Sequence, residues 1–296
     1  MTEVGPELIR ELLRDQHPDL AELPLHEVDG GWGNQMWRLG EDLAVRVQRM
    51  NATTESQLLE RLWLPQLAPR LPLPIPVPVR EGVPSRALPK IWTVVTWIPG
   101  LPLDQTVITR PDDAAEALGG FLEALHRTAP ADAPMDTVGR AAHPKDCDDG
   151  FDYFFSALDP ATLDGQGARA REIWNDATAA PAWDGPAVWV HGDLHPANVV
   201  VNNGSISGIV DFEGVHAGDP AADIAAAWVL LPDGAAERFF AVYSGADEAM
   251  VRRARGHALL KSLFLMLMGQ NGLRGVPGGK PAWGALGRAS LDRALA

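Results

Sequence analysis

The feature that most constrains the fold is a short run in which proline occupies every second position, at Pro72, Pro74, Pro76 and Pro78. Each proline lacks a backbone N–H and fixes its own φ angle, so the run cannot be helical and favours an extended chain. We interpret it as a rigid connector whose apolar residues pack inward. A ligand for a proline-reading domain is the alternative interpretation.

The sequence before the proline run predicts an antiparallel meander followed by a helix. Short apolar runs at Leu25–Val28, Gln35–Leu39 and Leu43–Gln48 are separated by turns that contain glycine, a pattern typical of hairpin-connected strands. The segment Thr54–Leu67 spaces its apolar residues for one face of a helix.

After the run, the pattern changes from strand-rich to helical. Ile91–Ile98 resembles a buried strand and ends at Pro99-Gly100, and most of the chain beyond Ala221 has a helical pattern. The predicted helices are Asp112–His126, Phe151–Leu158 and Ala168–Thr178, and the predicted strands are Ala187–Val190, Asn198–Val201 and Ile206–Val210, the last two joined at Asn202-Asn203-Gly204.

These patterns together predict an α+β fold of two lobes. A small lobe with an antiparallel sheet is expected over residues 1–98, and a larger, mainly helical lobe over residues 99–296, with a hinge near Trp97–Gly100.

The composition of the chain argues against some classes of function. The chain has 39 acidic and 25 basic residues and a net charge of -14, which argues against a nucleic-acid partner. This charge suits a cationic ligand or serves only solubility. The lone cysteine, Cys147, cannot form an intrachain disulfide, and the apolar run Leu259–Met268, interrupted by Lys261, is too short to span a membrane. We expect a cytoplasmic protein, monomeric or homodimeric, without a membrane partner.

The strongest chemical signal is a polar loop between two predicted strands, His191-Gly192-Asp193-Leu194-His195-Pro196-Ala197-Asn198, with Asp211-Phe212-Glu213 after the next strand. Phosphoryl transfer needs magnesium, which prefers oxygen ligands, and Asn198 and Asp211 supply an amide and a carboxylate. It also needs a carboxylate that orients the attacking hydroxyl and accepts its proton, and Asp193 is placed for that role.

This constellation resembles the aminoglycoside phosphotransferase family, small-molecule kinases that share the protein-kinase-like fold. The resemblance implies that Asp193 is the catalytic base, that Asn198 and Asp211 bind magnesium, and that His191 braces the loop. It implies ATP, or GTP in its place, together with Mg2+. Asp223 matches a buried aspartate that hydrogen-bonds the backbone of the catalytic loop in this fold.

The first lobe carries the residues expected to bind the nucleotide. Arg46 stands where kinases carry their strand lysine and would pair with Glu60 of the following helix. In the loop before the second strand, Gly31, Gly33 and Asn34 would let backbone N–H groups approach phosphate. By the same resemblance, the backbone of Thr96 and Ile98 would contact adenine.

The sequence also indicates a helix cap and three tryptophans that are candidates for an acceptor pocket. Asp219 is expected to cap a helix that begins at Pro220. Trp183, Trp228 and Trp283 are candidates for an acceptor pocket or for ordinary packing.

The acceptor hypothesis is a hydroxylated antibiotic, with an amine-rich one leading because of the acidic clusters at Asp146–Asp149, Asp152 and Asp247-Glu248. An ordinary metabolite, such as an amino alcohol or a sugar, is the alternative.

Two other classes of function compete. His191, Asp193 and His195 have the spacing of zinc ligands, which would suit a metallohydrolase. A pseudokinase that binds nucleotide without catalysis is the second alternative, although Asp193, Asn198 and Asp211 are all present.

Overall fold

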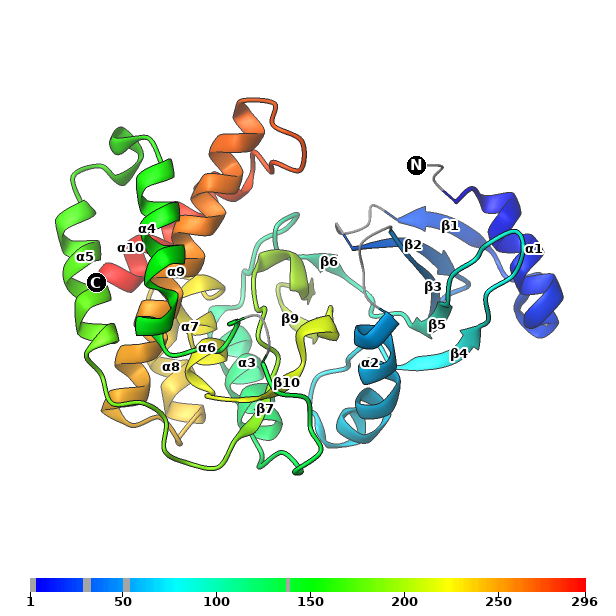
Figure 1. Cartoon of the computed structure of the whole chain (residues 1–296), viewed down its shortest axis with the longest axis horizontal. Helices are drawn as coiled ribbons and strands as arrows, with labels where there is room; N and C mark the ends of the chain where they lie inside the picture. Colours follow the sequence, from blue (N-terminus) through cyan, green and yellow to red (C-terminus); the bar gives the residue numbers. More distant parts are fainter. Residues whose placement is uncertain (1–3, 29–32, 50–53, 137–138) are drawn as a thin grey trace. The chain divides into compact units, whose positions relative to one another are not determined.

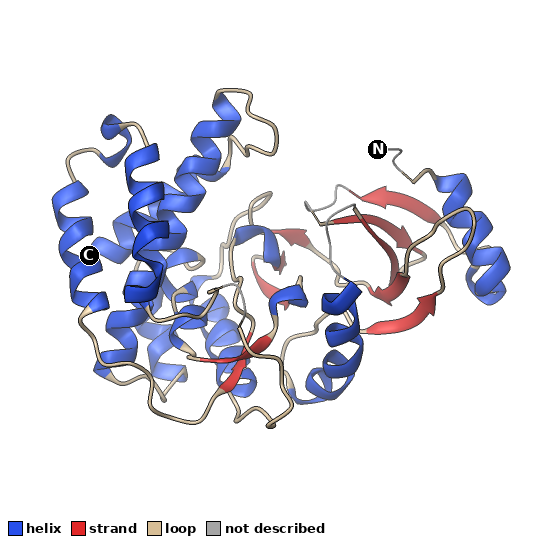
Figure 2. Cartoon of the chain, in the orientation of Figure 1, coloured by secondary structure: helices blue, strands red, loops and turns tan. Residues whose placement is uncertain are grey.

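The computed structural model describes residues 4–28, 33–49, 54–136 and 139–296. Within it the chain divides into two compact units. Unit 1 comprises residues 1–69 and 74–99, and unit 2 comprises residues 70–73 and 100–296. The antiparallel sheet of unit 1 and the mainly helical unit 2 agree with the predicted α+β class (Figure 2).

Unit 1 is built on a five-stranded antiparallel sheet in the order β1-β2-β3-β5-β4. Its strands are β1 Leu25–Val28, β2 Asn34–Leu39, β3 Leu43–Gln48, β4 Pro78–Gly82 and β5 Trp92–Thr96. The meander of β1, β2 and β3 was predicted from sequence. The order of the last two strands was not, because β5 pairs with β3 and leaves β4 at the edge.

The core of unit 1 lies between this sheet and the first helix, α1 Pro6–Gln16. Side chains of a β-strand alternate between its two faces, and β2 alternates half-buried with fully buried residues, among them Trp37 and Leu39. These pack with Leu12 and Leu13 of α1. The remaining elements of the unit are the helix α2 Thr54–Leu67 and the short 3-10 helices η1 Pro18–Leu20 and η2 Ala68–Arg70.

Part of the proline connector packs as its sequence suggested. Ile75 is buried, and its carbonyl accepts a hydrogen bond from the hydroxyl of Thr96. The N–H of Val77 donates to the same hydroxyl at 2.8 Å, and the N–H of Thr96 donates to the carbonyl of Val77 at 2.9 Å. The connector segment 74–78 is thereby fixed to the end of β5.

Unit 2 combines helices with two small antiparallel sheets. The helices are α3 Pro111–Leu125, α4 Asp148–Ala157, α5 Gly167–Thr178, α6 Ala221–Ile224, α7 Ala226–Val229, α8 Ala235–Val242, α9 Glu248–Leu273 and α10 Trp283–Leu295. One sheet contains β6 Leu101–Pro102, β8 Val199–Asn202 and β9 Ser205–Ile209, and the other contains β7 Val188–Val190 and β10 His216–Gly218. Unit 2 also contains the 3-10 helices η3 Pro144–Cys147, η4 Pro160–Leu163, η5 Pro196–Asn198 and η6 Phe212–Gly214.

The long helix α9 forms the centre of the helical packing, against α10, α5, α6 and α4 (Figure 1). The approach of α10 is close: a Cβ atom on Gly287 would lie only 2.6 Å from the backbone nitrogen of Met266. The hydroxyls of Ser262 and Ser290 also meet at 2.7 Å between these helices. This contact fixes the rotation of α9, so its remaining faces have defined neighbours.

The β8–β9 hairpin has the predicted turn. Asn203 and Gly204 both have positive φ angles, 51° and 77°, the geometry of a two-residue type I′ turn that asparagine and glycine favour. This turn leads the chain from the end of the polar loop directly to Asp211.

Among the helices of the described residues, none is long and apolar enough to cross a membrane.

Candidate active site

The polar loop predicted to carry the chemistry connects β7 to β8 and is fixed at its start by His191. The ring of His191 is fully buried; Nδ1 accepts the N–H of Asp193 at 3.2 Å, so Nε2 carries the proton and donates to the carbonyl of Val210 at 3.0 Å. Burial lowers the pKa of His191 and keeps the ring neutral. The ring thus links the start of the loop to Val210, and the role of His191 as a brace stays a prediction.

A buried carboxylate holds the backbone of the same loop. Oδ2 of Asp223 accepts the N–H of His191 at 2.7 Å, and Oδ1 accepts that of Gly192 at 2.9 Å. His126 adds a third contact, from Nε2 to Oδ2 at 3.2 Å. Burial alone would raise the pKa of Asp223, but His126, His191 and the Gly192 N–H together hold it below its ordinary value. The hydrogen bonds expected of Asp223 are therefore present.

Gly192 could not easily be another residue. Its φ angle is +77°, and a Cβ atom would lie 2.7 Å from the ring of His216. The backbone can therefore make its turn toward Asp193 only with glycine.

Asn198 and Asp211 are brought together by the backbone. The carbonyl of Asn198 accepts the N–H of Val210 at 2.9 Å, so Asp211 follows directly on a residue bonded to Asn198. The amide nitrogen of Asn198 donates to the carbonyl of Asp193 at 2.9 Å, which leaves the amide oxygen as the atom suited to a cation. Asp211 is exposed and has a left-handed backbone, with φ 66°.

This pair of oxygen donors fits magnesium. Mg2+ is commonly held by one or two protein oxygens and completes its shell with phosphate oxygens and water. In the part of the chain that the structure describes, no group of three His, Cys, Asp or Glu side chains is arranged to hold a metal ion by itself. A cation at Asn198 and Asp211 would thus share its coordination with a phosphate-bearing ligand.

The carboxylate of Asp193 lies between two cations. Nζ of Lys261 is 2.7 Å from Oδ1, and Nη1 of Arg140 is 3.5 Å from Oδ2. Burial would raise the pKa of Asp193, but Lys261, His195 and Arg140 outweigh it and hold the pKa well below its usual range. Asp193 is therefore ionised at neutral pH, in the form that accepts a hydrogen bond from a hydroxyl.

The histidines beside Asp193 do not form a zinc site. Both ring nitrogens of His191 are bonded to backbone groups, and Nδ1 of His195 accepts the N–H of Ala197 at 3.2 Å. Burial, with Lys261 next in size, lowers the pKa of His195 to about 3, so its ring is neutral at physiological pH. The arrangement does not support the metallohydrolase hypothesis.

In unit 1, Arg46 of β3 and Glu60 of α2 form a buried ion pair. Nη1 of Arg46 lies 3.1 Å from Oε1 of Glu60, and Nη2 contacts Oε2. Arg46 is 6% exposed and Glu60 is fully buried. A bidentate pair of this kind fixes the orientation of the guanidinium. The structure thus brings together the two residues that the family resemblance paired.

The other nucleotide-binding predictions lie at the ends of strands β2 and β5 of the same sheet, or just beyond them. Gly33 and Asn34 stand at the start of β2, where the carbonyl of Gly33 accepts the N–H of Arg49 at 2.8 Å. Gly31 lies outside the described residues. The N–H of Thr96 is already bonded to Val77, so only its carbonyl would serve adenine, and Ile98 is buried.

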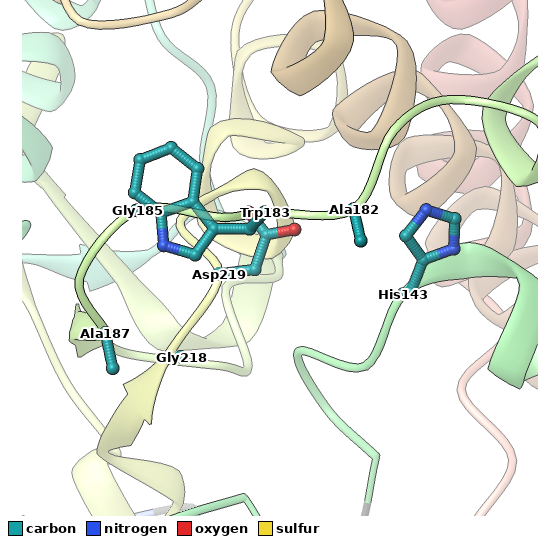
Figure 3. Close-up of a pocket in the computed structure, with 7 residues that line it drawn as sticks. All are labelled: His143, Ala182, Trp183, Gly185, Ala187, Gly218 and Asp219. Carbon is teal, nitrogen blue, oxygen red and sulfur yellow. The ribbon is translucent and has the colours of Figure 1, made fainter.

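A pocket of about 240 Å³ lies elsewhere in unit 2 (Figure 3). It is lined by His143, Ala182, Trp183, Gly185, Ala187, Gly218 and Asp219. None of the residues predicted to carry the reaction is in this set. Its carboxylate, Asp219, pairs with Arg253 at 2.7 Å and accepts the N–H of Ala221 at 2.9 Å.

The expected start of the adjoining helix was one residue early, because α6 begins at Ala221 with Pro220 as its N-cap. Of the tryptophans considered for an acceptor site, Trp183 lines this pocket, whereas Trp228 and Trp283 are buried. The indole N–H of Trp283 donates to Asp104 at 2.9 Å.

Sequence reasoning missed Lys261 and Arg140 as neighbours of Asp193. A signal existed for Lys261, because it is a charged residue within an apolar helical run, and such a residue is normally buried only with a partner. Arg140 lies in an irregular segment without comparable pattern.

Comparison with known proteins identifies phosphotransferases that resemble this chain. The chain is 30% identical over 186 residues to viomycin phosphotransferase of Streptomyces vinaceus, covering 60% of this chain and 63% of that protein. It is 25% identical over 184 residues to an aminoglycoside 3'-phosphotransferase of Escherichia coli, covering 58% and 65%. The chain thus spans less than two thirds of the length of these relatives.

Among solved structures, the GDP and kanamycin complex of APH(2")-IIia superposes with a TM-score of 0.69 at 19% identity, over 97% of both chains. This likeness confirms the predicted protein-kinase-like fold. The family described as the phosphotransferase enzyme family matches residues 24–257. The chain belongs to this phosphotransferase family.

Proposed function

We propose that this protein is a kinase that transfers the γ-phosphate of ATP, or of GTP in its place, to a hydroxyl of a small molecule. The acceptor we propose is an antibiotic rather than an ordinary metabolite, because two relatives are named as phosphotransferases of viomycin and of aminoglycosides. The observation that supports the reaction most is the catalytic loop of unit 2. There Asp193, Asn198 and Asp211 are held on one backbone frame by hydrogen bonds to Val210 and Asp223.

The roles in unit 2 follow from the contacts of each group. Asp193 orients the acceptor hydroxyl and takes its proton while the hydroxyl oxygen bonds to the γ-phosphorus and the bond to the departing nucleotide oxygen breaks. Asn198 and Asp211 would hold Mg2+, which when bound neutralises charge on the phosphate oxygens. His191 and Asp223 keep the loop in this conformation.

The roles in unit 1 concern the nucleotide. Arg46, oriented by Glu60, is proposed to grip phosphate oxygens, because a guanidinium keeps its charge at all physiological pH values. Gly31, Gly33 and Asn34 are proposed to bring backbone N–H groups to the phosphates. We place the purine against the backbone of Thr96 and Ile98.

We propose an antibiotic-type acceptor, aminoglycoside-like or other, with an ordinary hydroxylated metabolite as the second candidate. The names of the two relatives support this class. The acidic composition suggested a cationic acceptor, but two of the carboxylates on which that argument depends already have partners in unit 2. Asp148 accepts the indole N–H of Trp174 at 2.6 Å, and Asp152 pairs with Arg171 at 2.6 Å. These carboxylates already serve the packing of unit 2.

We also propose a cytoplasmic location.

The test is ATP turnover with a panel of aminoglycosides, viomycin, macrolides, amino alcohols and sugars, using the wild type and Asp193→Ala. We expect the substitution to reduce turnover roughly 10²- to 10⁴-fold, the usual contribution of a general base. Binding of MgATP should change little, because the proposed partner of Asp193 is the acceptor. Asp184→Asn, at an exposed position of unit 2, is the control.

Near-native turnover by Asp193→Ala would show that the base is wrongly assigned. MgATP binding without turnover of any acceptor would instead favour the pseudokinase alternative.

A further inference from the structure

Lys261 is a charged residue beside Asp193 to which the proposed reaction assigns no role. It lies on α9, and its Nζ reaches Oδ1 of Asp193 at 2.7 Å. Its side chain is 25% exposed, and Nζ also lies 5.9 Å from the ring centroid of Phe264, one turn along the helix. Because α9 is fixed by its packing against α10, the ammonium is held at the reacting carboxylate.

The second carboxylate oxygen of Asp193 also faces a cation. Nη1 of Arg140 lies 3.5 Å from Oδ2, so each oxygen has a positive group beside it. A hydroxyl that donates a hydrogen bond to Asp193 must therefore bind next to at least one of these cations. Lys261 is the closer of the two.

We propose that Lys261 is a specificity-determining residue, which directs phosphorylation to hydroxyls whose neighbouring carbons carry no ammonium group. This inference rests on the proposed kinase function and deepens it by naming the kind of hydroxyl. Lys261 also positions the carboxylate of Asp193 through their ion pair.

The physical reason is the crowding of like charges. An ammonium on the carbon next to the reacting hydroxyl would come close to the ammonium of Lys261, and in a partly desolvated site such a pair is disfavoured. A neighbouring hydroxyl or ether oxygen would instead accept a hydrogen bond from an N–H of the Lys261 ammonium that is not bonded to Asp193. The same group therefore favours one class of hydroxyl and opposes the other.

This local selection is compatible with a cationic acceptor. The net charge of -14 attracts cations over a distance, whereas Lys261 acts only at the reacting position. The acceptor we infer carries its amines away from the hydroxyl that is phosphorylated.

The experiment compares Lys261→Met, which removes the charge at similar length, with Lys261→Arg, which keeps it. Lys280→Met is the matched control, since Lys280 is a half-buried lysine of the same unit. Kanamycin A is the first acceptor because it carries both kinds of hydroxyl in one molecule, those of the 6-amino sugar flanked by oxygen-bearing carbons and those of the 3-amino sugar flanked by the amino group. Erythromycin and viomycin, then glucose and glucosamine, extend the comparison, and NMR of the products identifies the phosphorylated position.

We expect the wild type and Lys280→Met to favour hydroxyls without a neighbouring ammonium. Lys261→Met should shift the ratio of kcat/KM for the two kinds of hydroxyl by roughly 10-fold toward the ammonium-flanked kind, while Lys261→Arg should keep the wild-type ratio. A purely structural role would lower both values of kcat/KM together and leave their ratio unchanged.

An unchanged ratio in Lys261→Met, or a wild type that prefers ammonium-flanked hydroxyls, would overturn the role of Lys261 while leaving the kinase function intact. Absence of phosphorylated product from every acceptor, in the wild type and in Lys280→Met alike, would instead contradict the kinase function and this inference with it.

Discussion

The substitution Asp223→Asn tests how the catalytic loop is held in place. Asp223 is fully buried and accepts hydrogen bonds from the N–H groups of His191 and Gly192 and from His126. Asparagine has the same shape, but one of its two terminal atoms is an NH2 donor. Whichever way it is placed, that donor must face another donor at the loop backbone or at His126.

The cost can be estimated from these contacts. Losing one charge-assisted hydrogen bond costs about 1.5–3 kcal/mol, and leaving buried donors unsatisfied adds about 1–3 kcal/mol. We therefore expect Asp223→Asn to lower the free energy of unfolding by roughly 2.5–6 kcal/mol. That is a large part of the total stability of an ordinary domain, which is about 5–15 kcal/mol.

The assay combines urea unfolding with turnover measured on the folded variant below its unfolding transition. We expect kcat to fall at least about 10-fold, because the loop that carries Asp193 loses its anchor. Asp233→Asn is the control: its side chain is 91% exposed and its pair with Arg293 should contribute at most about 1 kcal/mol. A variant Asp223→Asn that unfolds at the wild-type urea concentration and turns over at the wild-type rate would refute the reasoning.

Further predictions concern metal binding and pH. Asn198→Ala and Asp211→Ala should both weaken magnesium-dependent nucleotide binding in calorimetry, and Asp211→Ala should weaken it more because it removes a full charge; the opposite order would argue against this metal site. Burial lowers the pKa of His257 from 6.5 to about 4, so its contribution to stability is complete above pH 6.5 and is lost as the pH falls toward 4. Its loss over that range amounts to about 3 kcal/mol. His257→Gln should therefore lose less stability than the wild type between pH 7.5 and 4.5 in urea unfolding, and equal losses would contradict this assignment.

The sequence by itself determined the parts of this protein that depend on neighbouring residues. The spacing of Asp193 and Asn198 predicted one polar loop, because a loop between two short strands must keep its side chains close together, and Asp211 follows the short hairpin that begins at the end of this loop. The Asn203-Gly204 turn was predictable for the same local reason, since few residue pairs tolerate two positive φ angles. The pairing of Arg46 with Glu60 needed more than local pattern and came from the family resemblance.

Only the tertiary structure decided what surrounds these groups. Lys261 is separated from Asp193 by 68 residues and reaches it only because α9 is packed against α10, α5 and α4. Likewise, β5 lies beside β3 and leaves β4 at the edge of its sheet, an order that strand patterns do not encode. Periodicity reports which face of an element is buried, whereas the partner on that face depends on how distant elements pack. The charge around Asp193, and with it the choice of acceptor hydroxyl that we propose, is set by that packing.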